Sequence, residues 1–151
     1  MQIKQGGLTT DAVITLLTEH HQDMLQHSPA ESVHALDLTA LQAENISFWS
    51  MWSNADLAGC GALQELDIDH AEIKSMRTAK GHLRKGVAEN MLRHILLEAK
   101  KRGYRKVSLE TGTQPAFLPA QRLYLKFGFQ VCPPFANYQD DPYSTFMSKS
   151  L

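Results

Sequence analysis

The chain has 151 residues, of which 43% are hydrophobic and 21% charged, and its 15 basic and 16 acidic side chains leave a formal net charge of −1. Such a chain fits one soluble globular domain over residues 1–151, with no general positive field for nucleic acid or for an anionic membrane. No apolar run approaches the roughly 18 residues of a spanning helix, and two cysteines are too few for a disulfide scaffold, so we expect a cytoplasmic protein.

The first third of the chain predicts a strand followed by two helices. Residues 1–4 alternate weakly between polar and apolar side chains and are expected to open a sheet. Thr9 or Thr10 can cap a helix that ends before Pro29, because proline disfavours helical geometry at the residue before it. A loop then leads to a short helix over residues 38–42.

Three strand-like runs follow over residues 46–52, 57–66 and 71–77, and the turn residues between them predict an antiparallel meander. In the second run, Gly59 and Gly61 indicate a bulge or close packing against the backbone. The third run alternates polar and apolar side chains, so we expect one face toward the core and one toward water.

The second half of the chain predicts helices between strands. Residues 87–102 carry a broad apolar stripe at helical spacing, end in three cations and are followed by Gly103, a typical residue after a helix. Because this helix connects the strands at 71–77 and 104–110, those two strands should pair in parallel. The remaining elements are a short helix and two strands, over residues 119–127, 129–132 and 145–151. The fold class is mixed α/β.

The turn before the helix at 87–102 carries the clearest local chemical signal. It reads His82-Leu83-Arg84-Lys85-Gly86-Val87-Ala88. A glycine at a helix start allows a ligand to approach the backbone, and the free N–H groups of the first helical turn form an anion site. Arg84 and Lys85 add positive charge, so the turn suits a diphosphate. On these residues alone, a tight turn with a solvated basic corner is the commoner explanation.

Three segments in order resemble the GNAT family of N-acetyltransferases, of the bacterial small-molecule type. Residues 83–88 are similar to the family's acyl-CoA-binding motif Q/R-x-x-G-x-G/A, and residues 71–78 to its central strand. Residues 120–129, AQRLYLKFGF, are similar to its A-x-x-L-Y-x-x-x-G-F segment. Leu83 departs from the usual Gln or Arg, and Phe117 from a frequent Asn. The fold this implies is a mostly antiparallel sheet with one splayed parallel pair, flanked by about four helices.

The resemblance implies acetyl-CoA as co-substrate. Its pyrophosphate would lie on the backbone amides of the turn, and its pantetheine arm would bond to the strand at 71–78 like an added strand. An amide at Met76 or a neighbour would polarise the thioester carbonyl. The residues expected to bind this molecule are Met76, Arg77, Thr78, Leu83, Arg84, Lys85, Gly86, Val87, Ala88 and Phe117.

The resemblance also implies catalytic roles. Tyr124 resembles the general acid that protonates the departing thiolate, although its place on an apolar helix stripe also suits a core tyrosine. Glu72 resembles a base carboxylate, with a surface glutamate as the alternative, and Glu110 is a second candidate for the same role. His34 or Asp37 would hold the acceptor, unless Asp37 only caps a helix and His34 is exposed.

We therefore expect an enzyme that moves acetyl from acetyl-CoA to a primary amine of a small molecule, by direct attack in a ternary complex. The seven histidines predict no metal site, because no HExxH or CxxC pattern accompanies them. Two alternatives stay open: a non-catalytic acyl-CoA-binding sensor of the same fold, and an acetyltransferase that modifies lysine or the N-terminal amine of a protein. A homodimer is an expectation from the family alone.

Overall fold

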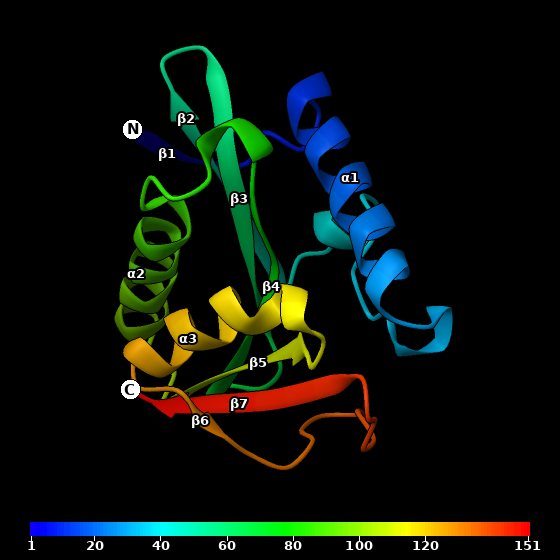
Figure 1. Ribbon diagram of the computed structural model, residues 1–151. Helices are drawn as coiled ribbons and strands as arrows, with labels where there is room; N and C mark the ends of the chain where they lie inside the picture. Colours follow the sequence, from blue (N-terminus) through cyan, green and yellow to red (C-terminus); the bar gives the residue numbers. More distant parts are fainter.

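Seven strands form one sheet in the order β1-β2-β3-β4-β5-β7-β6 in the computed structural model, which describes residues 1–151 (Figure 1). The strands are β1 Gln2–Gln5, β2 Ile46–Ser53, β3 Asp56–Glu65, β4 His70–Thr78, β5 Lys106–Gly112, β6 Gln130–Val131 and β7 Ser144–Ser150. The α-helices are α1 Asp11–His27, α2 Val87–Lys101 and α3 Leu118–Lys126. Single 3₁₀ turns, η1 to η4, lie at Ala30–Ser32, Ala40–Gln42, Lys80–His82 and Pro115–Phe117.

The sheet opens between its two central strands. β4 and β5 are its parallel pair, and they pair only along His70–Ile73 and Lys106–Leu109. Past these ranges β4 stays paired with β3 as far as Thr78, and β5 stays paired with β7 as far as Gly112. The C-terminal halves of β4 and β5 therefore diverge, and the backbone edges that face one another there are free for a ligand.

A bulge in β4 coincides with this opening. The register between β3 and β4 shifts where Ser75 and Met76 oppose the single residue Gly61, and Ser75 adopts a positive φ of 56°. A Cβ on Gly61 would lie 2.8 Å from Sδ of Met76 and 2.9 Å from Cδ1 of Ile95. The expectation of close packing at this glycine is confirmed.

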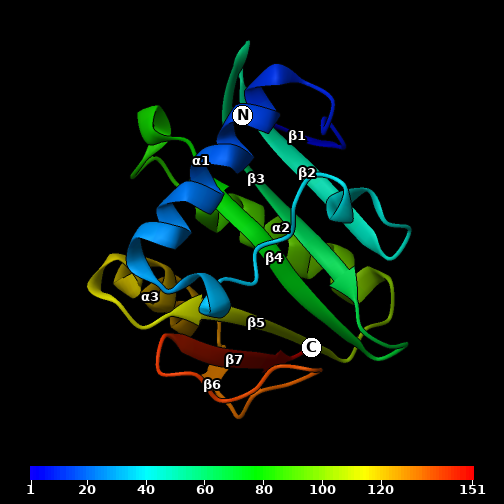
Figure 2. The same ribbon diagram turned by 90° about the vertical axis from the view of Figure 1, so that its right-hand side faces the viewer.

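The helices cover both faces of the sheet, with α1 in front and α2 behind in Figure 2. Thr10 caps α1 by accepting a hydrogen bond from the Val13 amide, and Ser28 follows the last helical residue, as the sequence predicts. The apolar stripe of α2 is buried in the larger core cluster, together with the face of α3 that carries Tyr124. None of the helices has the length and hydropathy that crossing a membrane would require.

Several predicted elements differ in detail. The helix expected over residues 38–42 is a single 3₁₀ turn, and the strand expected over 129–132 pairs only along Gln130–Val131. The strand face expected to meet water is covered: the side chains of Glu72 and Lys74 are only 3% and 8% exposed. Alternation identifies the polar face of a strand, but it carries no information about a distant loop that folds over this face.

Candidate active site

The turn before α2 presents its backbone to solvent. Gly86 is the N-cap of α2 with φ 80°, and Arg84 also has a positive φ, 61°. None of the backbone N–H groups from Leu83 to Glu89 donates to a backbone carbonyl. The side chains of Arg84 and Lys85 are exposed beside them. Free amides, the positive end of the helix dipole and two cations together make a site for an anionic group.

A cleft of about 130 Å³ lies where β4 and β5 diverge. Bulged β4 supplies one wall, β5 the second, and α1 and α3 close the sides. It brings together sequence-predicted residues that are far apart in the chain. These are His34, Glu72, Met76, Glu110, Phe117 and Tyr124.

Tyr124 reaches this cleft from α3 and is only 7% exposed. Its ring packs edge-on against Phe129, with 5.7 Å between the ring centroids. Burial raises the pKa of its phenol to about 12. No protein group hydrogen-bonds to the hydroxyl, so no second cause adds to this shift. The cleft is therefore lined by a phenol that stays protonated at neutral pH and has a proton to donate.

Phe117 stands at the other side of the cleft, where η4 leads into α3. A Cβ on Gly112 would overlap the ring of Phe117, so the ring has room only because this residue of β5 is glycine. The ring also meets His27 of α1 edge-on, with 5.9 Å between centroids. The side chain thus contributes an apolar wall rather than a polar contact.

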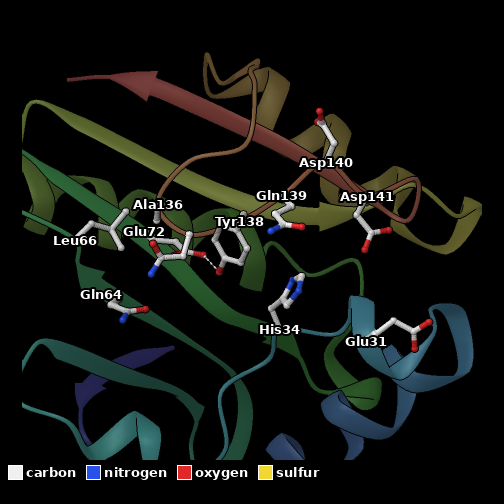
Figure 3. Close-up of a pocket in the computed structure, with 11 residues that line it drawn as sticks. Glu31, His34, Gln64, Leu66, Glu72, Ala136, Tyr138, Gln139, Asp140 and Asp141 are labelled. Atoms are coloured by element: carbon white, nitrogen blue, oxygen red, sulfur yellow. Dashed lines mark hydrogen bonds between the residues drawn. The ribbon is translucent and has the colours of Figure 1, made fainter.

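A second, larger pocket of about 540 Å³ adjoins the cleft, and the two share His34 and Glu72. Figure 3 shows the residues that line this pocket. The loop from Ala136 to Asp141 forms much of its lining. The carboxylates that line it are Glu31, Glu72, Asp140 and Asp141, with no lysine or arginine among the lining residues. The pocket therefore favours a cationic guest.

Glu72 is held in a network of three polar side chains. The hydroxyl of Tyr138 donates to Oε2 of Glu72 over 2.7 Å, and Nζ of Lys74 lies 3.3 Å from the same oxygen. Lys74 also donates to the Tyr138 hydroxyl over 2.8 Å. Burial raises the pKa of Glu72, although Lys74 and Tyr138 act in the opposite direction. Burial and then the Glu72 charge raise the pKa of Tyr138.

His34 and Glu110 form a second polar group at the junction of cleft and pocket. Nδ1 of His34 lies 2.8 Å from Oε1 and 2.7 Å from Oε2 of Glu110. The hydroxyl of Ser144, at the start of β7, donates to Oε2 over 2.8 Å. The Tyr138 ring packs against the His34 ring, with 5.1 Å between centroids.

Other predicted site residues lie elsewhere. Asp37 is exposed, lines neither space, and accepts a 2.7 Å hydrogen bond from the amide of Ala40, the first residue of η2. The Arg77 guanidinium pairs with Asp23 of α1, and Thr78 ends β4 opposite Gly59.

Four residues of the site are not predicted by the sequence: Lys74, Tyr138, Ser144 and the half-buried His20 of α1, which lines the cleft. Only Lys74 carried a signal, as the polar neighbour of Glu72 on an alternating strand. The loop that supplies Tyr138 has no pattern that predicts where it folds.

Comparison with known proteins places the chain in a family. The sequence pattern of the Acetyltransferase (GNAT) family matches residues 11–129. The chain is 56% identical, over 100% of both lengths, to the uncharacterized N-acetyltransferase YsnE of Bacillus subtilis. The chain therefore belongs to the GNAT family of acetyltransferases, which makes it an acyltransferase.

Solved structures have the same fold. One is a protein from Klebsiella pneumoniae named as an acyl-CoA N-acyltransferase, with TM-score 0.81 and 28% identity, covering 99% of this chain and 97% of that one. Another is a GNAT acetyltransferase from Elizabethkingia anophelis with acetyl-CoA bound, with TM-score 0.72 and 20% identity, covering 99% and 97%. The mixed sheet with one splayed parallel pair is the GNAT fold that the sequence predicts.

Proposed function

We infer that this acyltransferase moves acetyl from acetyl-CoA to a primary amine of a small molecule, by direct attack in a ternary complex. The observation that carries this inference is the unpaired hydroxyl of the buried Tyr124, which lines the cleft between β4 and β5. An enzyme that expels a thiolate needs a proton donor at this point, whereas a sensor that only binds a thioester does not.

The residues present fit a CoA thioester. The free amides from Leu83 to Glu89, with Arg84 and Lys85 beside them, suit a pyrophosphate. The free edge of β4 around Met76 suits the amides of a pantetheine arm, which would add to it as a strand does. When bound, acetyl-CoA supplies an activated carbonyl and a good leaving group.

The adjoining pocket suits a small acceptor. Its volume of about 540 Å³ lies within the range of about 300–1,000 Å³ that is typical of small-molecule sites. Carboxylates on its walls would attract a protonated amine. The loop from Ala136 to Asp141 borders the pocket.

Two carboxylates were candidates for the base that accepts the amine proton. Glu72 lines both the cleft and the pocket, and burial raises its pKa toward the range where a carboxylate can serve as a base. Glu110 lines the cleft only. Tyr124 would return a proton to the thiolate sulfur, and the backbone amides near Met76 would stabilise the charge on the carbonyl oxygen.

The test measures acetyl transfer to polyamines, amino acids, aminoglycosides and a peptide mixture, with CoA binding measured in parallel. We expect Tyr124→Phe to lower kcat about 10²–10⁴-fold with the dissociation constant for CoA unchanged. Tyr143→Phe is the matched control, because Tyr143 lines neither the cleft nor the pocket. Binding without transfer to any amine would make the chain a sensor, and faster transfer to peptides would make it a protein acetyltransferase.

A further inference from the structure

We propose that His34 is the general base that takes the proton from the acceptor amine, and that Glu110 and Ser144 are positioning residues that orient it. This proposal rests on the proposed function, since it assigns the base of the same reaction. The observation that carries it is the paired contact of one His34 nitrogen with both carboxylate oxygens of Glu110, at the junction of cleft and pocket.

The contact fixes which ring nitrogen is free. An ionised carboxylate only accepts hydrogen bonds, so Nδ1 of His34 carries the proton in the neutral ring. Nε2 then holds a lone pair, and no protein group hydrogen-bonds to it. A base oriented by a carboxylate, with its other nitrogen free, is the arrangement that general-base histidines use.

The support around the pair is extensive. Ser144 donates to Oε2 of Glu110, which keeps the carboxylate in place from the neighbouring strand. The ring of Tyr138 packs against the ring of His34 and limits its rotation. Glu110 is only 12% exposed, while the side chain of His34 is 34% exposed and open to the pocket. The geometry therefore buries the orienting group and leaves the base accessible.

Glu72 is less free to act. Its Oε2 accepts from both Tyr138 and Lys74, and the residue is 3% exposed. A proton taken onto this oxygen would compete with the hydrogen bonds that Tyr138 and Lys74 donate to it. Glu72 thus anchors the Tyr138 loop and through Tyr138 supports the position of His34, whereas Nε2 of His34 has no hydrogen-bond partner in the protein.

The charged groups around His34 come from several elements. Glu110 faces it from β5, Glu72 and Lys74 lie on β4, and Asp141 and the Tyr138 phenol face it from the loop after β6. Carboxylates of β5, β4 and the loop after β6 are thus placed around the ring. The opposing charge of Lys74 is offset by its contact with Glu72.

The proton balance of the reaction closes with these residues. Nε2 of His34 takes one proton from the ammonium form of the acceptor, and the free amine nitrogen attacks the thioester carbon. The C–N bond forms and the C–S bond breaks, and Tyr124 gives its proton to the sulfur. As the amide forms, the acceptor nitrogen loses a further proton. This proton passes to the Tyr124 oxygen and restores the phenol. His34 then releases its proton to water, which is the net proton of the reaction.

The first test needs no turnover. Nitrogen NMR of protein labelled at histidine distinguishes the two neutral tautomers. We expect His34 in the parent protein to carry its proton on Nδ1, and Glu110→Ala to shift the ring toward the other tautomer. A proton on Nε2 of His34 in the parent protein would overturn the proposal.

The second test is kinetic, on a primary alkylamine that the parent protein acetylates. We expect His34→Gln to lower kcat/KM about 10²–10⁴-fold. It should also change the acid limb of the pH profile of kcat/KM and leave the affinity for CoA unchanged. His21→Gln, on the exposed side of α1, is the matched control. His34→Ala should recover rate on addition of imidazole, and Ser144→Ala should lose less rate than His34→Gln.

The outcomes separate the two proposals. Full activity and an unaltered pH profile in His34→Gln would overturn the role of His34 while the acetyltransferase function stands. If the same profile changes appeared instead in Glu72→Gln, the base would be Glu72. If the parent protein neither binds CoA nor acetylates any amine, the proposed function itself fails.

Discussion

The hydroxyl of Tyr138 donates to Oε2 of Glu72 over 2.7 Å, and this bond joins the loop after β6 to the central strand of the sheet. Lys74 completes the contact from two residues further along β4. Because Tyr138 also packs against His34, one hydrogen bond links the anchoring strand, the wall of the pocket and the proposed base. The shape of the pocket therefore depends on this residue pair.

We predict that Tyr138→Phe destabilises the protein. The change leaves the buried Glu72 carboxylate without one donor and Lys74 without one acceptor, which should lower the free energy of unfolding by about 1–3 kcal/mol. Urea unfolding measures this difference. Tyr143→Phe removes a hydroxyl that has no hydrogen-bond partner and should change stability little, so equal stability of the two variants would contradict the account.

We predict that Glu72→Gln removes a pH dependence of stability. Burial raises the pKa of Glu72 above its ordinary 4.5, so the folded protein holds this proton more tightly than the unfolded chain does. The stabilisation that this bound proton gives the folded protein is complete below pH 4.5. It is lost as the pH rises through the raised pKa of Glu72. The free energy of unfolding of the variant, taken relative to that of the parent, should therefore increase as the pH rises. Urea unfolding from pH 4 to 7 measures this difference. A difference that is constant across this range would contradict the assignment.

We predict acid destabilisation from His20. Burial, with a smaller effect of Arg77, lowers the pKa of His20 from 6.5 to about 4, so the folded protein holds this ring neutral. The stabilisation is present above pH 6.5 and is lost as the pH falls toward 4, by up to about 1.4 kcal/mol per pH unit. Unfolding of His20→Gln should show a flatter slope in this window. The exposed neighbour His21 gives the control His21→Gln, and matching slopes in both variants would refute the prediction.

We predict that the basic corner at Arg84 and Lys85 contributes to CoA affinity through the phosphates. Arg84→Glu and Lys85→Glu should each weaken CoA binding by at least about tenfold and reduce its sensitivity to salt. Binding of pantetheine, which lacks the pyrophosphate, should stay unchanged. Lys100→Glu, at the other end of α2, reverses a charge away from the turn and is the control. Equal weakening by all three changes would indicate a general charge effect.

Local signals point to the parts of the candidate site that are local. Gly86 at the helix start and Tyr124 in its short helix could be placed from a few neighbouring residues. The pair of His34 and Glu110 spans 76 positions of the chain, and no pattern in either segment specifies the other. For the same reason the alternation at Glu72 and Lys74 predicted a wet face, because the covering Tyr138 lies more than sixty residues further along.

The most direct measurement is an amide NMR titration of the labelled protein with CoA and, separately, with pantetheine. We predict that the N–H signals from Leu83 to Glu89 shift saturably with CoA, because their free donors take up the pyrophosphate, and that pantetheine moves signals around Met76 without moving these. If CoA binds while the signals from Leu83 to Glu89 stay in place, the phosphate site is not at the start of α2 and the account is contradicted.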